Sequence, residues 1–290
     1  MLPDRLIVLT GATHGLGRVA ALELARRGAR LALVARDRDK AERTRAELRA
    51  AAPGASVDLH FADLTRLAEV RRVGEEIAAK HARIDVLINN AGVHGFAQRV
   101  TPDGLPEMIA VNYLAPWLLT RILLPALTAA GRARVVTVAS EASRRHGTLS
   151  LPADLTDTRP FTARGSSAIY GKSKLLDIMF SLELARRLEA TGVEAVCLDP
   201  GFNVTGLGRD LWFAAPLERV LRALKIGDPA RGAGLIVELA VGTSIADRDG
   251  RYFTVKGRRA LTPAPPGGDG ALQRRLWAET EALLVRLGVW

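Results

Sequence analysis

Residues 6–17 read LIVLTGATHGLG, an apolar run that passes directly into a glycine-rich turn. The apolar residues 6–9 have the composition of a short buried strand. Gly11, Gly15 and Gly17 suit a tight turn from that strand into a helix, because missing side chains let backbone N–H groups approach a pyrophosphate. The spacing is G-x-x-x-G-x-G rather than G-x-G-x-x-G, and glycine-rich turns of this kind are common in α/β proteins. The stretch therefore predicts an α/β domain that opens with a nucleotide-binding turn.

Apolar segments alternate with helical patterns along the rest of the chain. The predicted strands are residues 6–9, 30–34, 56–61, 84–88, 134–138, 193–198 and 252–255. Such alternation predicts a Rossmann-type, doubly wound parallel sheet with helices on both faces and right-handed crossovers. The chain has 290 residues, 48% of them hydrophobic, and α/β domains of this size often form one core. We therefore expect a single domain over residues 1–290, with its ligands at the carboxyl ends of the strands.

A second motif lies far downstream, where Tyr170 is followed four residues later by Lys174. Residues at i and i+4 share one helical face, so the Lys174 ammonium can lower the pKa of the Tyr170 phenol. In chain order the polar motifs are the glycine turn, Asn89-Asn90-Ala91-Gly92, Asn112, Ser140, Tyr170, Lys174 and Asp199-Pro200-Gly201. With these motifs the chain resembles the short-chain dehydrogenase/reductase family over nearly its whole length. Segments 33–37 (LVARD), 112–114 (NYL) and 168–174 (AIYGKSK) resemble its retinol-dehydrogenase-like branch.

The resemblance implies an oxidoreductase that interconverts a carbonyl, either a ketone or an aldehyde, with an alcohol. Tyr170 would be the general acid in reduction and the general base in oxidation, and the Ser140 hydroxyl would supply a second hydrogen bond. Lys174 would keep the phenol acidic and hold the nicotinamide ribose, while Asn112 would help to place a water-linked proton relay. Ser143 is the alternative serine, and Asn112 could instead hydrogen-bond locally.

NADP(H) is the predicted cofactor because of Arg36 at the end of the second strand. Arg36 lies about 20 residues after the glycine turn, where NAD enzymes carry a carboxylate. A guanidinium at that place can pair bidentately with a 2′-phosphate. Asp37 keeps NAD(H) as the alternative, since its carboxylate could bind ribose hydroxyls, although it can equally cap the following helix.

By resemblance, Asp63 would contact adenine, Asn89 and Ala91 would line the adenosine side, and Thr205 would reach the carboxamide. His14 would assist the phosphate, or lie at the surface as a neutral side chain. Asp63 could otherwise cap the next helix, and Thr205 could satisfy the backbone of its turn. The complete predicted cofactor-binding set is Thr10, Gly11, Thr13, His14, Gly15, Leu16, Gly17, Arg36, Asp63, Leu64, Asn89, Ala91, Gly92, Tyr170, Lys174, Pro200, Gly201 and Thr205.

Three further segments complete the prediction. Residues 203–226 carry several large apolar side chains and are the expected substrate lid, which favours a small hydrophobic substrate. Residues 144–167 contain prolines and glycines and are expected to form a loop with little regular structure. Residues 271–288 predict a final amphipathic helix. An apolar stripe follows Tyr170 and would pack on the core or on a second copy in a homodimer or homotetramer. Its members are Leu175, Ile178, Met179, Leu182 and Ala185.

Composition argues against other classes of partner. The net charge is +10, but the arginines lie beside glutamates along helices, so we expect no nucleic-acid partner. Cys197 is the single cysteine and the five histidines are scattered along the chain, so we expect no disulfide within the chain and no metal. No run of about 18 apolar residues is present, and the first strand starts too early for a leader, so we expect a cytoplasmic protein without a membrane span. The alternatives to a dehydrogenase are a non-catalytic NADP(H)-binding regulator and an elimination or rearrangement enzyme.

Overall fold

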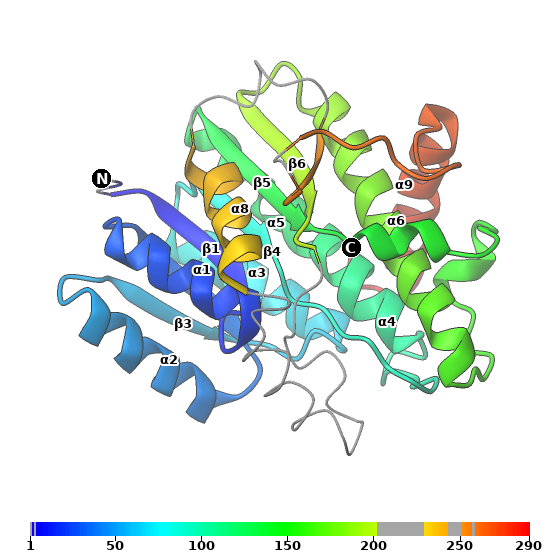
Figure 1. The fold of residues 1–290 in the computed structure, drawn as a ribbon, viewed down its shortest axis with the longest axis horizontal. Coiled ribbons are helices and arrows are strands. Elements are labelled where there is room, and N and C mark those ends of the chain that lie inside the picture. The colour runs from blue at the N-terminus through cyan, green and yellow to red at the C-terminus, as the bar shows by residue number, and fades with distance from the viewer. Residues whose placement is uncertain (1, 3, 202–228, 243–250, 257–258) are drawn as a thin grey trace.

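The structure is a computed structural model that describes residue 2 and residues 4–201, 229–242, 251–256 and 259–290. A seven-stranded sheet runs through it in the order β3-β2-β1-β4-β5-β6-β7 (Figure 1). All of its neighbouring strands are parallel. The strands are β1 (Leu6–Thr10), β2 (Arg30–Ala35), β3 (Val57–Phe61), β4 (Val86–Asn89), β5 (Ala133–Val138), β6 (Val193–Asp199) and β7 (Tyr252–Thr254). The predicted Rossmann-type sheet is confirmed, and β1 beside β4 is its topological switch point.

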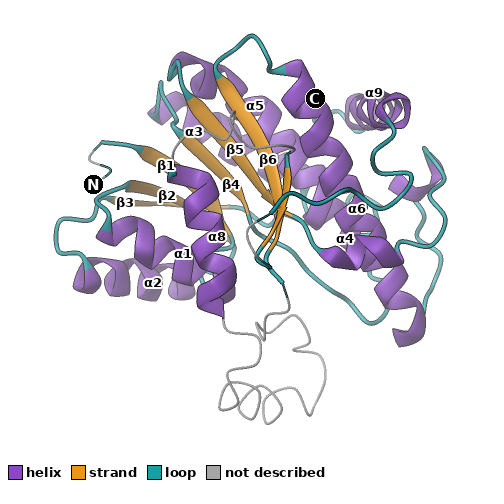
Figure 2. Ribbon diagram, turned by 45° about the horizontal axis from the view of Figure 1, so that its top comes forward, coloured by secondary structure: helices purple, strands orange, loops and turns teal. Residues whose placement is uncertain are grey.

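Helices cover both faces of the sheet, as Figure 2 shows. One face carries α1 (Gly15–Arg26), α2 (Arg38–Ala51) and α8 (Pro229–Val241). The other carries α3 (Leu67–Lys80), α5 (Ala115–Ala129) and α6 (Ala163–Arg187), with α9 (Gly270–Arg286) packed against α6. Each face has its own apolar core. The central strands are therefore buried on both sides, which explains their nearly continuous apolar sequences.

The segment before Tyr170 is more regular than its sequence indicates. Residues 144–167 were expected to form a loop, but α6 already begins at Ala163, after an extended N-cap at Thr162. The Ser166 hydroxyl donates to the carbonyl of Ala163 at 2.8 Å within this first turn. Two short 3₁₀ helices precede it, η2 (Glu141–Arg145) and η3 (Ala153–Leu155). The expected lid, residues 203–226, lies outside the described residues.

The apolar stripe of α6 is used inside this chain. Leu175 and Met179 are fully buried in the core that α6 shares with α3, α5 and α9, and Ile178 is buried against Cys197 and Tyr252. Packing on the core, one of the two predicted alternatives, therefore describes these three residues, whereas Leu182 and Ala185 are only partly buried. A homodimer or homotetramer stays a prediction.

Among the described residues, one helical run, Glu107–Ala129, is long and apolar enough to cross a membrane by length and composition. It comprises α4 (Glu107–Ile109), the π-helix η1 (Ala110–Leu114) and α5. Its most apolar window is 78% buried, and Trp117 and Leu118 are completely enclosed by the core. A buried core helix of a folded protein meets the same criterion, so the run is accounted for by packing.

Candidate active site

The glycine turn after β1 has the geometry that its sequence predicts. Gly11 and Gly15 have φ values of +72° and +55°, the left-handed region that favours glycine. A Cβ on Gly11 would lie 2.9 Å from Ala91 Cα, and one on Gly17 would collide with the carbonyl oxygen of Gly11. Any larger residue at Gly11 or Gly17 would therefore push the turn apart. The turn leads directly into α1, the arrangement that presents backbone N–H groups to a phosphate.

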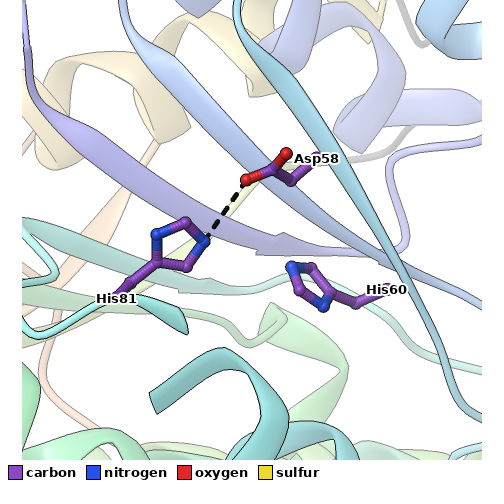
Figure 3. Close-up of side chains that lie close together, drawn as sticks. All are labelled: Asp58, His60 and His81. Atoms are coloured by element: carbon purple, nitrogen blue, oxygen red, sulfur yellow. Dashed lines mark ion pairs between the residues drawn. The ribbon is translucent and has the colours of Figure 1, made fainter. Parts of the chain in front are cut away.

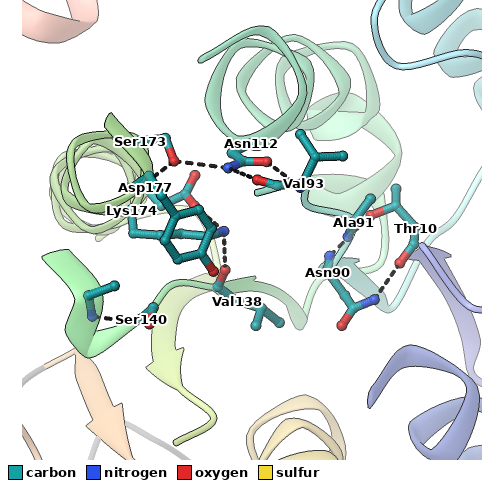
Figure 4. A network of polar contacts seen from close by, with 12 residues as sticks. Thr10, Asn90, Ala91, Val93, Asn112, Val138, Ser140, Ser173, Lys174 and Asp177 are labelled. Carbon is teal, nitrogen blue, oxygen red and sulfur yellow. Dashed lines mark hydrogen bonds and ion pairs between the residues drawn. The ribbon is translucent and has the colours of Figure 1, made fainter. Parts of the chain in front are cut away.

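Thr10 and Asn90 hold this turn against the end of β4 (Figure 4). The Thr10 hydroxyl accepts hydrogen bonds from the backbone N–H groups of Asn90 at 3.1 Å and Ala91 at 3.0 Å. The Asn90 amide in return donates to the carbonyls of Thr10 at 2.9 Å and Gly11 at 3.2 Å. Asn90 was not among the predicted site residues, although its place in the NNAG motif was a signal that could have found it.

Asn89 turns away from this network. Its side-chain amide donates to the Thr120 hydroxyl of α5 at 2.9 Å, and the residue is buried. Any contact of Asn89 with a cofactor would therefore come from its backbone. Gly92 lies next to the catalytic candidates, since a Cβ there would be 3.5 Å from Asn112 Oδ1 and 3.7 Å from Lys174 Nζ.

Arg36 and Asp37 separate into two roles at the end of β2. Arg36 follows the last residue of the strand and is exposed. Asp37 is the N-cap of α2, where its carboxylate accepts the backbone N–H of Lys40 at 3.0 Å and lies 3.0 Å from the Lys40 ammonium. The backbone hydrogen bond from Lys40 lowers the pKa of Asp37. Asp37 therefore caps α2, which was one of its two predicted roles, and Arg36 is the exposed residue at the end of β2.

Asp63 also has a local partner. Its carboxylate accepts the N–H of Thr65 at 3.0 Å and the Thr65 hydroxyl at 2.8 Å. Helix α3 instead has Arg66 at its N-cap position, and the N–H of Leu67 donates to Asp103 at 2.7 Å. Asp63 therefore stabilises the turn after β3 and does not cap α3, as the alternative supposed.

The remaining predicted cofactor residues lie on the same edge of the sheet. The Thr13 hydroxyl lies 3.4 Å from His14 Nδ1 at the exposed start of α1. Leu16 packs on the apolar core beneath α1 and α8, and Leu64 packs on the core of the other face. Pro200 and Gly201 directly follow β6, with Gly201 at φ +74°. Thr205 lies outside the described residues.

Tyr170 and Lys174 share one side of α6, with Lys174 held firmly in place. The Lys174 ammonium donates to the carbonyl of Val138 at the end of β5 at 2.9 Å and to Asp177 at 2.8 Å (Figure 4). Lys174 and Asp177 are both buried. Asp177 was not singled out from the sequence, because a carboxylate three residues after a lysine usually marks a solvated helix face.

Burial changes the electrostatic expectation for this pair. Lys174 does lower the pKa of Tyr170, but burial acts more strongly, and Asp177 and Asp199 add to it, so the pKa of Tyr170 is raised overall. Burial opposes the charge on Lys174, yet Asp177 and Tyr170 outweigh it and raise the pKa of Lys174. Burial raises the pKa of Asp177 to about 6, against the effect of Lys174. The expectation of an acidic phenol is therefore corrected. The pKa of Tyr170 is raised, and the Lys174 ammonium pairs with Asp177 as well as lying beside Tyr170.

Asn112 connects the loop after β4 to the tyrosine helix. Its side-chain oxygen accepts the N–H of Val93 at 2.8 Å, and its amide donates to the Val93 carbonyl at 3.0 Å and to the Ser173 hydroxyl at 2.9 Å. Ser173 in turn donates to the carbonyl of Tyr170 at 2.8 Å. Asn112 is buried within the π-helix η1, a distortion that is frequent at functional sites.

Ser140 is brought to Tyr170 by close packing of η2 on α6. Ser140 lies two residues after the end of β5 and caps η2, its hydroxyl accepting the N–H of Ala142 at 3.1 Å. A Cβ on Gly171 would collide with the carbonyl of Ala142, so glycine beside the tyrosine lets the serine turn approach. Ser143 is 1% exposed, whereas Ser140 is half-buried, and this favours Ser140.

His94 is a site residue that the sequence did not indicate. Its ring stacks on that of Tyr170, with centroids 4.5 Å apart and planes 21° apart, and the Phe96 ring also packs on it, with centroids 4.9 Å apart. Burial lowers the pKa of His94, which keeps the imidazole neutral near pH 7. The contact joins residues 76 positions apart in the sequence, so no local pattern could reveal it.

Comparison with known proteins agrees with this geometry. The family model for short chain dehydrogenase matches residues 5–151. Human retinol dehydrogenase 13 is 34% identical over 288 residues, covering 98% of this chain and 85% of that protein. A crystal structure of a Mycobacterium paratuberculosis protein is 29% identical with a TM-score of 0.71, covering 97% of this chain and 93% of that one. The structure of a metagenomic short-chain oxidoreductase in complex with NADP is 25% identical with a TM-score of 0.64, covering 90% of this chain and 99% of that one. The chain therefore belongs to the short-chain dehydrogenase/reductase family, in its retinol-dehydrogenase-like branch.

Proposed function

We propose that this oxidoreductase uses NADP(H) to interconvert a ketone or aldehyde with an alcohol on a small hydrophobic molecule, with Tyr170 as general acid and base. The observation that carries the proposal is the joining of Tyr170, Lys174, Asn112 and the Ser140 turn at the carboxyl edge of the sheet. A shielded phenol beside a buried ammonium is suited to moving one proton.

The residues present fit a dinucleotide. A side chain at Gly17 would fill the space inside the first turn, so the turn is built for backbone approach, and it would hold the pyrophosphate. Arg36 is exposed beside that turn and would bind a 2′-phosphate. The NADP complex of the metagenomic relative supports this choice. When bound, the nicotinamide supplies the hydride for reduction or accepts it in oxidation.

The chain itself handles the proton. In reduction, the carbonyl oxygen gains negative charge as its carbon receives hydride, and the Tyr170 phenol transfers its proton to that oxygen. The Ser140 hydroxyl donates a second hydrogen bond to the same oxygen. The Lys174 ammonium stabilises the phenolate that remains, and its bond to the carbonyl of Val138 fixes the ammonium's position. Alcohol oxidation runs these transfers backwards, with the Tyr170 phenolate accepting the proton.

A hydrophobic substrate is favoured by the surroundings of Tyr170. The neutral His94 ring stacks on Tyr170, and the Phe96 ring packs on His94. Retinol dehydrogenase 13 is named for an apolar alcohol, which supports the same class. A non-catalytic NADP(H)-binding regulator and a non-redox enzyme are the competing functions, and neither requires the proton-transfer role of Tyr170.

The decisive test is Tyr170→Phe, assayed with NADPH and a panel of apolar ketones and aldehydes while nicotinamide absorbance is followed. Loss of the transferable proton should lower kcat by about 100-fold to 10,000-fold. NADPH affinity should stay nearly unchanged, because the ring remains, and this also shows that the variant is folded. NADPH binding without turnover by the natural protein across the panel would instead favour the competing functions.

Cofactor choice is tested by Arg36→Asp. Charge-assisted hydrogen bonds are worth about 1.5–3 kcal/mol, so kcat/KM with NADPH should fall by about 10-fold to 100-fold, while that with NADH should not fall. Arg49→Asp removes an exposed arginine from the far end of α2 and controls for net charge. If both variants keep the original NADPH to NADH ratio, Arg36 is not the phosphate-binding residue.

A further inference from the structure

Two histidines and an aspartate converge beneath the edge strand, on elements separate from the candidate active site (Figure 3). Asp58 and His60 are two residues apart on β3 and therefore face the same side of the sheet. His81 directly follows α3 and closes its last turn. One ligand atom from each residue lies within 4.8 Å of the other two.

Both imidazoles direct an unsatisfied nitrogen into this cluster. His60 is 2% exposed and His81 7% exposed. Among the described residues, neither Nε2 atom has a hydrogen-bond partner. His81 Nε2 is 3.3 Å from Asp58 Oδ2, close enough for charge attraction. Buried polar atoms are normally hydrogen-bonded, so two unpaired ring nitrogens beside one carboxylate indicate that a further group binds here.

Glu76 orients the ring of His60. Its carboxylate on α3 lies 2.6 Å from His60 Nδ1. An ionised carboxylate only accepts hydrogen bonds, so Nδ1 donates to Glu76 and Nε2 is the ring nitrogen that faces the cluster. This carboxylate–imidazole arrangement is the one that orients histidine ligands in metal sites. Burial lowers the pKa of His81, and Asp58 only partly opposes this.

We propose that Asp58, His60 and His81 form a site for a divalent transition metal, with Zn²⁺ the best match. The ligands would be His60 Nε2, His81 Nε2 and a carboxylate oxygen of Asp58, with a water molecule in the fourth position. Tetrahedral zinc with bonds of about 2.0–2.1 Å separates its ligands by about 3.3 Å. The cluster reaches that geometry when each ligand atom moves inward by about 1 Å or less.

Lys80 is the internal competitor for this site. Its ammonium lies 3.0 Å from Asp58 Oδ2 and half of its side chain is exposed. The hydrogen bond from Lys80 lowers the pKa of Asp58 despite burial, so the carboxylate is already ionised and ready to bind a cation. Because the lysine side chain is long and solvated, it can leave Asp58 when a metal arrives.

The test is titration of the untagged protein with Co²⁺, followed by the visible absorption of tetrahedral Co²⁺ and by Zn²⁺ competition. One equivalent should bind, and Zn²⁺ should displace it and raise the melting temperature. Asp58→Asn with His81→Gln should abolish the absorption. His146→Gln, a change to a histidine of a different element, should leave it intact.

Two single variants on α3 sharpen the test, because both side chains are half exposed and their loss should not prevent folding. Glu76→Gln should weaken Co²⁺ binding by about 10-fold to 100-fold, the usual cost of losing a carboxylate behind a histidine ligand. Lys80→Gln should strengthen binding, because it removes the competing cation. Absence of binding by the natural protein, or unchanged absorption in the Asp58/His81 double variant, overturns the proposal. Neither result depends on enzymatic activity.

Discussion

At the scale of single residues, the buried pair of Lys174 and Asp177 decides how the tyrosine behaves. Exposed ion pairs contribute about 0–1 kcal/mol, whereas removing one partner of a buried pair costs about 3–5 kcal/mol. Lys174 Nζ and Asp177 Oδ2 are 2.8 Å apart, and both side chains are nearly inaccessible to solvent. The Asp177 carboxylate therefore offsets part of the electrostatic effect of Lys174 on Tyr170. We infer that Asp177 positions the Lys174 ammonium and weakens that effect.

This arrangement predicts the pH dependence of an Asp177→Asn variant. The Asp177 carboxylate raises the pKa of Tyr170 and Lys174 lowers it, so a neutral amide at 177 should lower the pKa of the phenol. The amide oxygen can still accept the hydrogen bond from Lys174. Alcohol oxidation needs the phenolate, so its rate should reach half of its maximum at a lower pH, measured as kcat against pH with NADP⁺.

Glu183→Gln provides the matched control for that profile. Glu183 is a buried carboxylate of the same helix, paired with Arg186 and Arg187 instead of Lys174. Its loss should affect stability without moving the pH at half-maximal rate. A uniform fall in kcat for Asp177→Asn, with its pH midpoint unmoved, would reduce Asp177 to a structural role.

At the scale of elements, α6 depends on α9 for its outer support. Trp277 of α9 stacks on Phe180 of α6 with centroids 5.9 Å apart, and it packs on Trp117 of α5 at 5.2 Å. The guanidiniums of Arg187 and Arg121 lie 4.3 and 5.2 Å from its ring, within the range of cation–π attraction. The C-terminal helix therefore holds the helix that carries Tyr170.

Removal of this ring should destabilise the whole fold. Trp277 is 3% exposed, and truncation of a buried aromatic to alanine costs about 3–5 kcal/mol. We expect Trp277→Ala to lower the free energy of unfolding by that amount in a urea titration. Val285→Ala, at a 55% exposed position of the same helix, should change it by less than about 0.5 kcal/mol. Equal losses in the two variants would contradict the role assigned to α9.

At the scale of the whole molecule, the proposed cofactor site joins parts of the chain that lie far apart in sequence. The glycine turn follows β1, the NNAG turn follows β4, and the tyrosine helix packs beside β5 and β6. Because parallel strands end at one edge, these segments meet at the switch point. A ligand that binds there should stabilise the native state as a unit.

NADPH should therefore protect the protein against unfolding. At about 100 times its Kd, a ligand that binds only the native state adds about 2.7 kcal/mol. NADH at the same concentration should add less, because it lacks the phosphate proposed to pair with Arg36. Chemical denaturation with each nucleotide measures the difference, and equal protection by both would contradict the proposed NADP(H) preference.

Local sequence determined the layers of this protein and much of its candidate site. The strands could be predicted because a strand buried on both faces is mostly apolar, as in β1 and β5. The glycine turn could be predicted because only glycine adopts the required backbone angles without strain. Tyr170 and Lys174 could be paired because a helix places i and i+4 on one face.

Tertiary structure alone decided which side chains meet across elements. The stacking of His94 on Tyr170, the close approach of Ser140 allowed by Gly171, and the gathering of His60 with His81 all join segments that local periodicity treats as independent. The sign of the pKa shift at Tyr170 also depended on burial, which no spacing reveals. Sequence patterns report the conformation of neighbours along the chain, whereas desolvation and contact depend on how the layers close around each group.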